Sequence, residues 1–321
     1  MDDLLDPELL VAARSYQTID LLDVEAARRA DSAAVAQVQT SDVPGLVPEA
    51  TEIRNLTVPG IDGSPSVRIR TYSPIKRTHA EVGGLLFIHG GAFCAGDLET
   101  DHLRCLAYSQ RAQIVVINVE YRLAPEHPYP AAFSDCCRVF EWIVENSAVL
   151  GVDPSAIGVG GESAGGALAA AVVSRYTATA TRPACLVLLF PVLDHRMETS
   201  SMKCETETPA WNSFQTALMW ELYLGNGAQA GMVSPSASPA LLADLRGLPS
   251  TLLITAGLDP LRDEGIEFGV RLADANVHVQ QLNYPGGFHV FDFAVPKASI
   301  SQHALRRQIQ FLQSALGSND A

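Results

Sequence analysis

The feature that most limits the possible folds of this chain is a serine placed between two glycines, at the point where a strand meets a helix. Residues 155–160 form a short apolar run typical of a buried strand, and residues 166–173 are the small and aliphatic residues of a helix. The turn between them reads Gly161-Glu162-Ser163-Ala164-Gly165. Such a turn is sharp and strained and exposes the serine hydroxyl, because side chains at the two glycines would collide with the neighbouring elements. The pattern therefore predicts a strand–turn–helix unit with Ser163 as a nucleophile.

Beyond this unit, apolar runs and helical patterns alternate along the chain. Apolar runs of strand length occur at 84–88, 114–119, 156–159, 186–190, 251–255 and 277–282. Helical stretches between most of them lie at 100–111, 131–149, 165–180, 261–275 and 297–316. This alternation predicts an α/β fold with a mostly parallel central sheet flanked by helices on both faces. Residues 52–58 and 67–72 alternate at period two around Asp62-Gly63, which predicts an antiparallel hairpin at the entry to the sheet.

Two segments leave this rhythm and show helical patterns only. In residues 7–38 apolar side chains recur at helical spacings, and residues 194–247 carry aromatic residues at such spacings without a strand pattern. We interpret residues 1–48 as an N-terminal helical cap segment and 194–247 as a cap insertion. Together they would cover the strand ends of a core formed by residues 49–193 and 248–321. The alternative is an ordinary layer of surface helices on the sheet.

Charge and composition exclude several classes of protein. The formal net charge of −14 argues against nucleic acid or an anionic membrane surface as a partner, because both require basic patches. The acidic start of the chain is unlike a secretory signal, and the longest apolar run, 184–193, is too short to span a bilayer. We therefore expect a cytoplasmic protein with six reduced cysteines. No Cys-x-x-Cys or Cys/His spacing suggests a zinc site.

A serine hydroxyl becomes a strong nucleophile only when a base takes its proton and an acid orients that base. For a serine on this type of turn, the acid and then the histidine follow in the chain. His278 falls within the last strand pattern and His303 within the terminal helix, whereas His289 follows a Pro-Gly-Gly-Phe turn after that strand, so we expect His289 to be the base. Asp259, directly after the preceding strand, is the expected acid. A helix N-cap is the alternative role for Asp259, and Asp263 is the alternative acid.

The tetrahedral intermediate of acyl transfer carries an oxyanion, which backbone amides stabilise. Directly after the run 84–88 the chain reads His89-Gly90-Gly91-Ala92-Phe93, and small residues let the backbone approach a substrate closely. We expect the amides of Gly91, Ala92 and Ala164, the residue after the serine, to form an oxyanion hole. A tight turn without a chemical role is the alternative for the glycine pair.

Five motifs occur in one order: His89-Gly90-Gly91-Ala92, the run from Tyr121 to Ala131, Gly161-Glu162-Ser163-Ala164-Gly165-Gly166, Asp259-Pro260-Leu261-Arg262-Asp263 and Gly287-Phe288-His289. With them the chain resembles the hormone-sensitive-lipase-like esterases, also called bacterial family IV. The resemblance implies an α/β-hydrolase core with a helical cap, and hydrolysis of short- to medium-chain acyl esters without a metal or cofactor. It also implies Ser163, Asp259 and His289 as the catalytic triad, and Gly91, Ala92 and Ala164 as oxyanion donors. Dimerisation through the sheet edge near 277–282 is a further implication.

Two positions depart from the family pattern. Ala92 stands where glycine is commoner, but it keeps the backbone amide, so only the volume of the pocket changes. Glu162 stands where aspartate is usual, and a longer carboxylate there can alter the hydrogen bonds around the site and its pH profile. For the run from Tyr121 to Ala131 we expect a structural clamp that contains an Arg122–Glu126 pair. We expect the remaining motif residues to support the site, namely His89, Gly90, Gly161, Glu162 and Gly165.

These observations predict a serine carboxylesterase that acts on a small-molecule ester through an acyl-enzyme. Amides, lactones and carbamates develop the same oxyanion, so the triad does not distinguish among these bonds. The other alternative is a non-catalytic small-molecule receptor on the same fold, as in the plant gibberellin receptors, which lack the catalytic histidine that this chain retains. Core packing is the simpler role for the aromatic residues, but four of them are candidates to line a substrate pocket: Phe93, Trp211, Phe214 and Trp220.

Overall fold

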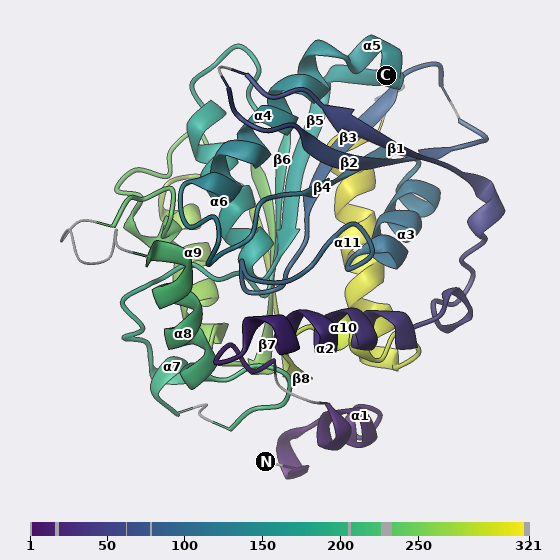
Figure 1. The fold of residues 1–321 in the computed structure, drawn as a ribbon. Coiled ribbons are helices and arrows are strands. Elements are labelled where there is room, and N and C mark those ends of the chain that lie inside the picture. The colour runs from purple at the N-terminus through teal and green to yellow at the C-terminus, as the bar shows by residue number, and fades with distance from the viewer. Residues whose placement is uncertain are drawn as a thin grey trace.

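The computed structural model describes residues 2–16, 19–61, 63–77, 79–204, 207–225 and 233–317. Over these residues the chain forms one eight-stranded sheet with helices on both faces (Figure 1). The strands are β1 (Thr51–Val58), β2 (Val67–Pro74), β3 (Val82–Ile88), β4 (Val115–Glu120), β5 (Val152–Glu162), β6 (Cys185–Leu189), β7 (Ser250–Leu258) and β8 (Val279–Phe288). The α-helices are α1 (Leu10–Ser15), α2 (Val24–Gln37), α3 (His102–Ala112), α4 (Ala131–Glu145), α5 (Ser147–Leu150), α6 (Ala164–Tyr176), α7 (Ser200–Cys204), α8 (Ser213–Leu224), α9 (Arg262–Asp274), α10 (Phe291–Ala294) and α11 (Ser299–Leu316).

The sheet is parallel except at its first two strands. Its strand order is β1-β2-β4-β3-β5-β6-β7-β8, and only the β1–β2 and β2–β4 pairs are antiparallel. In the hairpin, Val58 lies opposite Val67. The predicted α/β fold and its antiparallel entry are therefore confirmed. Because β3 and β5 to β8 run in one direction, the residues that follow these strands gather at one edge of the sheet.

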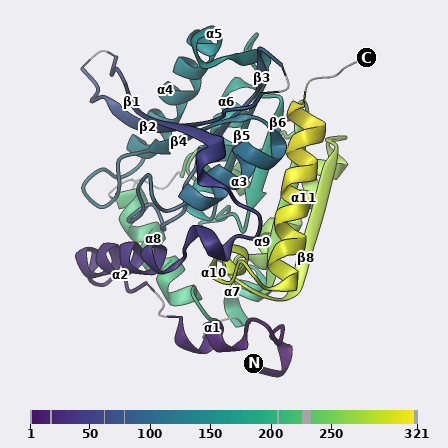
Figure 2. The same cartoon turned by 90° about the vertical axis from the view of Figure 1, so that its right-hand side faces the viewer.

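The central strands are buried on both faces, which is why they read as continuous apolar runs. Every residue of β3 is buried. Leu86 and Ile88 belong to the core beneath α4, α6 and α9, whereas Leu85 and Phe87 belong to the core beneath α3 and α11 on the opposite face (Figure 2). Helix α6 consists mainly of glycine, alanine and valine, and it lies against β3, β5 and β6. Its position fixes where the turn before it lies.

Residues 7–38, predicted to be helical, contain the two helices α1 and α2. α1 ends at Ser15, and the next residue, Tyr16, adopts an extended backbone conformation (φ −69°, ψ 120°). α2 begins at Val24, because the carboxylate of Asp23 accepts a hydrogen bond from the amide of Ala26 (2.9 Å) and caps the helix. The apolar spacing continues across this break, so the periodicity alone did not reveal it.

The N-terminal helices and the helices of residues 194–247 meet at one end of the molecule. α1, α2, α7 and α8 lie at the end of the sheet where β8 finishes and α10 begins (Figures 1 and 2). The amide of Leu21 donates to Oε1 of Gln215 in α8 (2.8 Å), which joins the two segments. As predicted, the described parts of 194–247 contain helices and no strand. None of the helices described here is long and apolar enough to cross a membrane.

Candidate active site

Ser163 occupies the junction of β5 and α6, in a backbone conformation that side chains rarely adopt (φ 54°, ψ −118°). Its amide donates to the carbonyl of Leu189 at the end of β6 (2.8 Å). Its carbonyl accepts from the amides of Gly166 (3.0 Å) and Val192 (3.1 Å). Strain of this kind persists only where the surrounding structure enforces it. The end of the neighbouring strand and the first turn of α6 thus fix the position of the serine.

Both glycines beside Ser163 are required by close contacts. A Cβ on Gly161 would overlap the carbonyl group of Gly165 and lie 2.9 Å from the amide nitrogen of Gly166. A Cβ on Gly165 would lie 2.5 Å from the carbonyl oxygen of His89 and still closer to that of Ile88. Real Cβ atoms essentially never come within 3.0 Å of such groups. The turn therefore packs directly against the end of β3 and the loop that follows it.

Three side chains that lie far apart in the chain form one hydrogen-bonded line. Nε2 of His289, which follows β8, lies 3.0 Å from Oγ of Ser163, and Nδ1 of His289 lies 2.7 Å from Oδ2 of Asp259, which follows β7. The exposed fractions are 6% for Ser163, 5% for His289 and 1% for Asp259, so water competes little for these bonds. A neutral imidazole that donates from Nδ1 to a carboxylate presents its Nε2 lone pair to the serine and can take its proton.

Asp259 is also held by its own loop, because its Oδ1 accepts from the amide of Leu261 (2.9 Å), the residue before α9. It thus combines the two roles weighed from the sequence, facing the histidine and binding an amide at the helix start. Asp263, the alternative acid, instead accepts from Nε of Arg262 (2.7 Å) and from the amide of Ser201 (2.7 Å). The carboxylate hydrogen-bonded to the imidazole is therefore that of Asp259.

The two alternative histidines lie elsewhere. His278 immediately precedes β8, and its carbonyl accepts from the amide of Thr251. Nδ1 of His303, in α11, lies 2.9 Å from the hydroxyl of Tyr284. Neither ring has a hydrogen bond to Ser163 among the described residues.

The loop after β3 carries two of the amides expected to face an oxyanion. Gly91 (φ 99°) and Ala92 (φ 56°) both adopt left-handed conformations, and a Cβ on Gly91 would lie 2.6 Å from the carbonyl carbon of Ala95. Within the described residues, neither amide donates to a protein acceptor. Ala164 is the first residue of α6, so its amide has no acceptor within the helix. None of the three amides therefore has a backbone acceptor among the described residues.

A buried tyrosine, Tyr121, contacts the start of this loop with its hydroxyl group and its ring. The hydroxyl of Tyr121 lies 3.1 Å from the carbonyl oxygens of both His89 and Gly90. The ring of His89 stacks on that of Tyr121, with 4.2 Å between centroids, and Nδ1 of His89 lies 2.7 Å from the Gly90 carbonyl. The sequence indicated a supporting role for the Tyr121–Ala131 run, but it did not identify the tyrosine hydroxyl as the supporting group.

Two aromatic rings flank His289. The ring centroid of Trp211, from the predicted cap insertion, lies 6.2 Å from that of the imidazole, and the centroid of Phe190 lies 5.9 Å from it. Phe190 was not among the predicted site residues. It ends an apolar strand run, where nothing in the sequence distinguishes it from a core residue.

The other candidate pocket residues separate into a buried group and an exposed one. Phe93 stacks on Tyr223 (3.7 Å between centroids) and lies 6.1 Å from Trp220, and all three are buried. Phe214 points from the same helix as Trp220 and Tyr223 but is 56% exposed. α8 thus presents two of its aromatic residues to Phe93, in the loop after β3, and one to solvent.

The expected Arg122–Glu126 pair is wrong. Arg122 binds Asp135 of α4 with its Nη2 (2.7 Å), its Nε and its backbone amide. Glu126 instead pairs with Nη2 of Arg28 in α2 (2.6 Å), and the same arginine donates from Nε to the carbonyl of Cys94 (2.7 Å). The run after β4 is clamped, but by partners from α2 and α4 rather than by a pair within it.

Glu162, whose role the sequence left open, forms an ion pair with Arg104, a fully buried residue of α3. Burial raises the pKa of Glu162 well above its ordinary value; Arg104 opposes this shift, while Asp101 and Asp292 add to it. No sequence signal marked Arg104 or Asp292, because an arginine in an amphipathic helix normally faces solvent.

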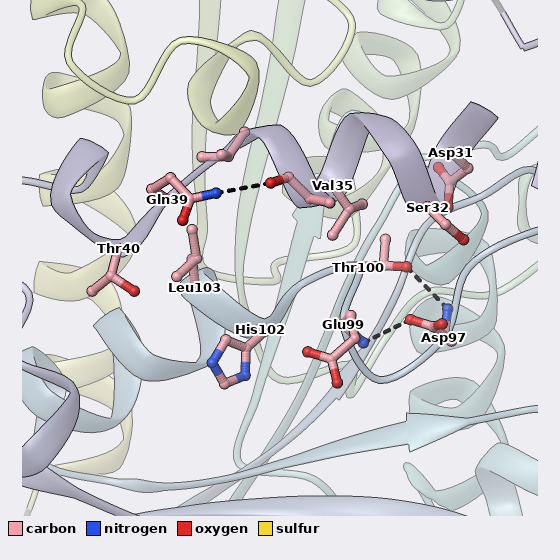
Figure 3. A pocket seen from close by; sticks show the side chains of 12 residues that line it. Asp31, Ser32, Val35, Gln39, Thr40, Asp97, Glu99, Thr100, His102 and Leu103 are labelled. Atoms are coloured by element: carbon pink, nitrogen blue, oxygen red, sulfur yellow. Dashed lines mark hydrogen bonds between the residues drawn. The ribbon is translucent and has the colours of Figure 1, made fainter. Parts of the chain in front are cut away.

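A cavity of about 340 Å³ lies between α2 and the start of α3 (Figure 3). It is lined by Asp31, Ser32, Val35, Ala36, Val38, Gln39, Thr40, Asp97, Glu99, Thr100, His102 and Leu103. None of the predicted site residues is among them. Burial raises the pKa of Asp31 to about 6, with a further contribution from the charges of Asp97 and Asp101. In the part of the chain that the structure describes, no group of three or more His, Cys, Asp or Glu side chains could hold a metal ion.

Comparison with known proteins adds independent information. A family model described as alpha/beta hydrolase fold matches residues 85–293. The carboxylesterase NlhH of Mycobacterium tuberculosis is 34% identical over 297 residues, which cover 89% of this chain and 91% of that protein. An arylesterase of Saccharolobus solfataricus is 31% identical over 70% of this chain and 72% of its own.

Solved structures of esterases are also similar to this chain, over nearly its whole length. The structure of a bacterial heroin esterase has a TM-score of 0.92 and 37% sequence identity, and the match covers 98% of this chain and 99% of that one. The esterase LipW of Mycobacterium marinum has a TM-score of 0.87 and 32% identity, with 98% of this chain and 96% of its own covered.

Proposed function

We propose that this chain, which belongs to the α/β-hydrolase fold family and is a carboxylic ester hydrolase, is a serine esterase with Ser163, His289 and Asp259 as its catalytic triad. The resemblance to the hormone-sensitive-lipase-like esterases is confirmed. One observation carries this proposal, namely the buried hydrogen-bonded line from Oγ of Ser163 through the imidazole to the carboxylate of Asp259. The carboxylate orients the ring and stabilises its cation.

In the proposed reaction, Oγ of Ser163 attacks the ester carbonyl carbon while its proton passes to Nε2 of His289. The tetrahedral intermediate collapses by breaking the bond to the alcohol oxygen, which receives the proton from Nε2 and leaves as the alcohol. A water molecule then gives a proton to Nε2 and attacks the acyl-enzyme. Breaking the bond to Oγ releases the carboxylic acid and returns the proton to the serine.

The amides of Gly91, Ala92 and Ala164 supply the oxyanion hole in this proposal. Two observations support them: they have no protein acceptor among the described residues, and the turn that carries Ala164 packs against the end of β3. Preorganised donors of this kind are worth more than groups that must reorient, and losing one costs roughly 10²–10³ in kcat.

We further propose that residues 1–48 and 194–247 form a cap over the core of residues 49–193 and 248–321. The contacts of Trp211 with His289 and of Trp220 with Phe93 support an apolar wall beside the substrate. We propose that the substrate is a small-molecule ester with a short- to medium-chain acyl group. Phe214 is not part of this wall because it is exposed. Since β8 is an edge strand, two copies of the chain are proposed to pair along it, which sedimentation of the purified protein tests.

The proposal is tested with p-nitrophenyl esters of increasing acyl length and with labelling by a p-nitrophenyl phosphonate. Wild type is expected to turn over the butyrate ester and to take up one phosphonyl group, and Ser163→Ala is expected to lose both. Ser109→Ala is the matched control, because Ser109 is equally buried and donates to the carbonyl of Tyr72. It is expected to keep turnover within a few-fold. A wild-type protein with neither turnover nor labelling, or an active Ser163→Ala variant, contradicts the proposal.

A further inference from the structure

Arg104 binds three carboxylates at once in the interior of the protein. Its side chain is fully buried, and its guanidinium carbon lies 4.1 Å from the ring centroid of Phe293. Nε donates to Oδ1 of Asp101 (2.9 Å), Nη1 donates to Oδ2 of Asp292 (2.8 Å), and Nη2 donates to Oε2 of Glu162. A planar guanidinium can satisfy several acceptors in fixed directions, which an ammonium group cannot.

Two of these carboxylates belong to the segments that carry the reacting groups. Glu162 is the last residue of β5 and directly precedes Ser163. Asp292 lies in α10, three residues after His289, and only one residue separates His289 from that helix. Arg104 therefore links the turn that holds the nucleophile to the loop that holds the base, from a third element, α3.

The link on the side of the base is reinforced. Nε2 of Gln308, in α11, donates to the same Oδ2 of Asp292 (2.9 Å). Oε1 of Gln308 accepts from the hydroxyl of Tyr108 (2.6 Å) and from Nη1 of Arg104 (3.2 Å). Asp292 is thus held by two donors that are themselves fixed, so a shift of the guanidinium is transmitted to α10.

We propose that Arg104 is a positioning residue for ester hydrolysis, which sets the distance between the Ser163 hydroxyl and the His289 imidazole by holding Glu162 and Asp292 together. The inference rests on the proposed function, since it assigns Arg104 a role through the triad. The distance between Oγ of Ser163 and Nε2 of His289 is 3.0 Å. A misplacement of about 1 Å in such a geometry can cost about 10²-fold in rate.

The charges around Arg104 make it possible to distinguish a positioning role from a purely structural one, because the two roles predict different effects of amide variants on activity. One guanidinium faces the carboxylates of Asp101, Glu162 and Asp292. Burial, with a further contribution from the charge of Glu162, raises the pKa of Tyr16 in the N-terminal segment to about 12. Excess buried negative charge opposes folding. Replacing Glu162 or Asp292 by its amide removes part of that excess and keeps the size of the side chain. If the cluster served stability alone, such a variant would keep its activity.

The test compares Glu162→Gln, Asp292→Asn and Arg104→Lys with wild type, by Tm, KM, and kcat per phosphonate-labelled site. For the two amide variants we expect an unchanged or higher Tm, KM within about 2-fold, and kcat lower by about 10-fold or more. Arg104→Lys is expected to lose more, because the single ammonium nitrogen of lysine cannot replace the three guanidinium nitrogens that each bind a different carboxylate. Arg271→Lys is the control: that arginine donates to the carbonyls of Ala240 and Leu242, which do not belong to the cluster, and its variant should keep kcat.

The pH dependence gives a second readout. As the pH falls and Glu162 takes up a proton, its bond to Arg104 loses the charge contribution, so wild-type kcat should fall toward that of Glu162→Gln. The ratio of the two kcat values should therefore approach one at low pH. If Arg104→Lys does not fold, the amide variants still decide the matter. Amide variants that label and retain wild-type kcat per site overturn the inference and leave the esterase proposal intact, whereas a wild type without turnover or labelling removes the esterase proposal itself.

Discussion

A single added methyl group at Gly165 tests how tightly the turn at Ser163 and the loop after β3, the proposed sites of the nucleophile and of two oxyanion donors, depend on each other. In Gly165→Ala the new Cβ would lie 2.5 Å from the carbonyl oxygen of His89 and 2.7 Å from the carbonyl carbon of Ile88. The tightest real contacts of this kind begin at 3.0–3.4 Å. The carbonyl oxygen of Ile88 lies closer still, so the start of α6 and the end of β3 must separate by about 1 Å or more, because backbone atoms cannot rotate away as a long side chain does.

This separation acts directly on the proposed chemistry. Ile88 and His89 lead into Gly91 and Ala92, whose amides are the proposed oxyanion donors on one side, while Ala164 supplies the donor on the other. Functional groups must stay within about 0.5 Å of the productive geometry. Losing the alignment of one donor costs roughly 10²–10³ in kcat. We expect kcat of Gly165→Ala to fall by about 10² or more, with a stability loss of about 1–3 kcal/mol from overpacking.

The assay is kcat on p-nitrophenyl butyrate, normalised to the folded fraction from urea unfolding. Gly63→Ala is the matched control, because Gly63 has a φ of 83° and a Cβ there meets nothing within 4 Å. It should lose about 1–2 kcal/mol of stability through backbone strain alone and keep its kcat. A Gly165→Ala variant that folds and keeps wild-type kcat refutes the argument that these contacts set the distance between the donors.

Three further outcomes are expected. Asp259→Asn should lower kcat by about 10⁴-fold, whereas Asp263→Asn should change it by less than about 10-fold, since only Asp259 binds the imidazole; equal losses in the two variants contradict this assignment. Asp31 has a pKa raised from 3.8 to about 6, so folding favours its protonated form and the free energy of unfolding falls as the pH rises through this interval. Urea unfolding of Asp31→Asn should therefore show a gain of about 1–3 kcal/mol over wild type at pH 8 and none at pH 4, and a gain of the same size at both values would be inconsistent with this titration. Tyr121→Phe removes the hydroxyl beneath the oxyanion loop and should lower kcat about 10-fold with a stability loss of about 1–2 kcal/mol; unchanged kcat would mean that His89 and Gly90 need no such support.

The sequence predicted the elements whose patterns are produced locally. Strands buried on both faces must be apolar throughout, so β3 and β7 were visible as runs. Gly161 contacts Gly165 and Gly166 within its own turn, so this glycine marked the turn locally, whereas Gly165 contacts Ile88 and His89 at the end of β3. The order serine, aspartate, histidine then limited the candidates for the acid and the base. Asp259 and His289, which follow β7 and β8, are the two that form a hydrogen-bonded line with Ser163.

The sequence did not predict features that depend on distant partners. A pair four residues apart, as expected for Arg122 and Glu126, is favourable on a helix, but this run is not helical and each side chain finds its partner on another element. The prediction of a helical segment over residues 7–38 did not locate the break between α1 and α2, because the apolar spacing persists on both sides of it. The capping residue, Asp23, was the available signal, since aspartate is a preferred N-cap and an acidic residue, Glu25, follows in the first turn.

Two arginines, Arg28 and Arg104, connect the loops of the candidate site to other elements. Their chemistry explains why the sequence indicated candidate site residues but not the contacts that hold them in place. Arg28 joins α2 to the carbonyls of Cys94, in the loop after β3, and of Ala124, in the run after β4. Arg104 joins Glu162, beside Ser163, to Asp292, in the helix after His289. Each uses the several donors of one guanidinium to bind acceptors that are remote from each other in the chain, and no spacing rule encodes such a set. A parallel sheet brings the proposed catalytic residues to one edge, whereas we expect the distances among them to depend on cross-links of this kind. Activity should therefore be more sensitive to these two arginines than to apolar residues of the sheet with equal burial.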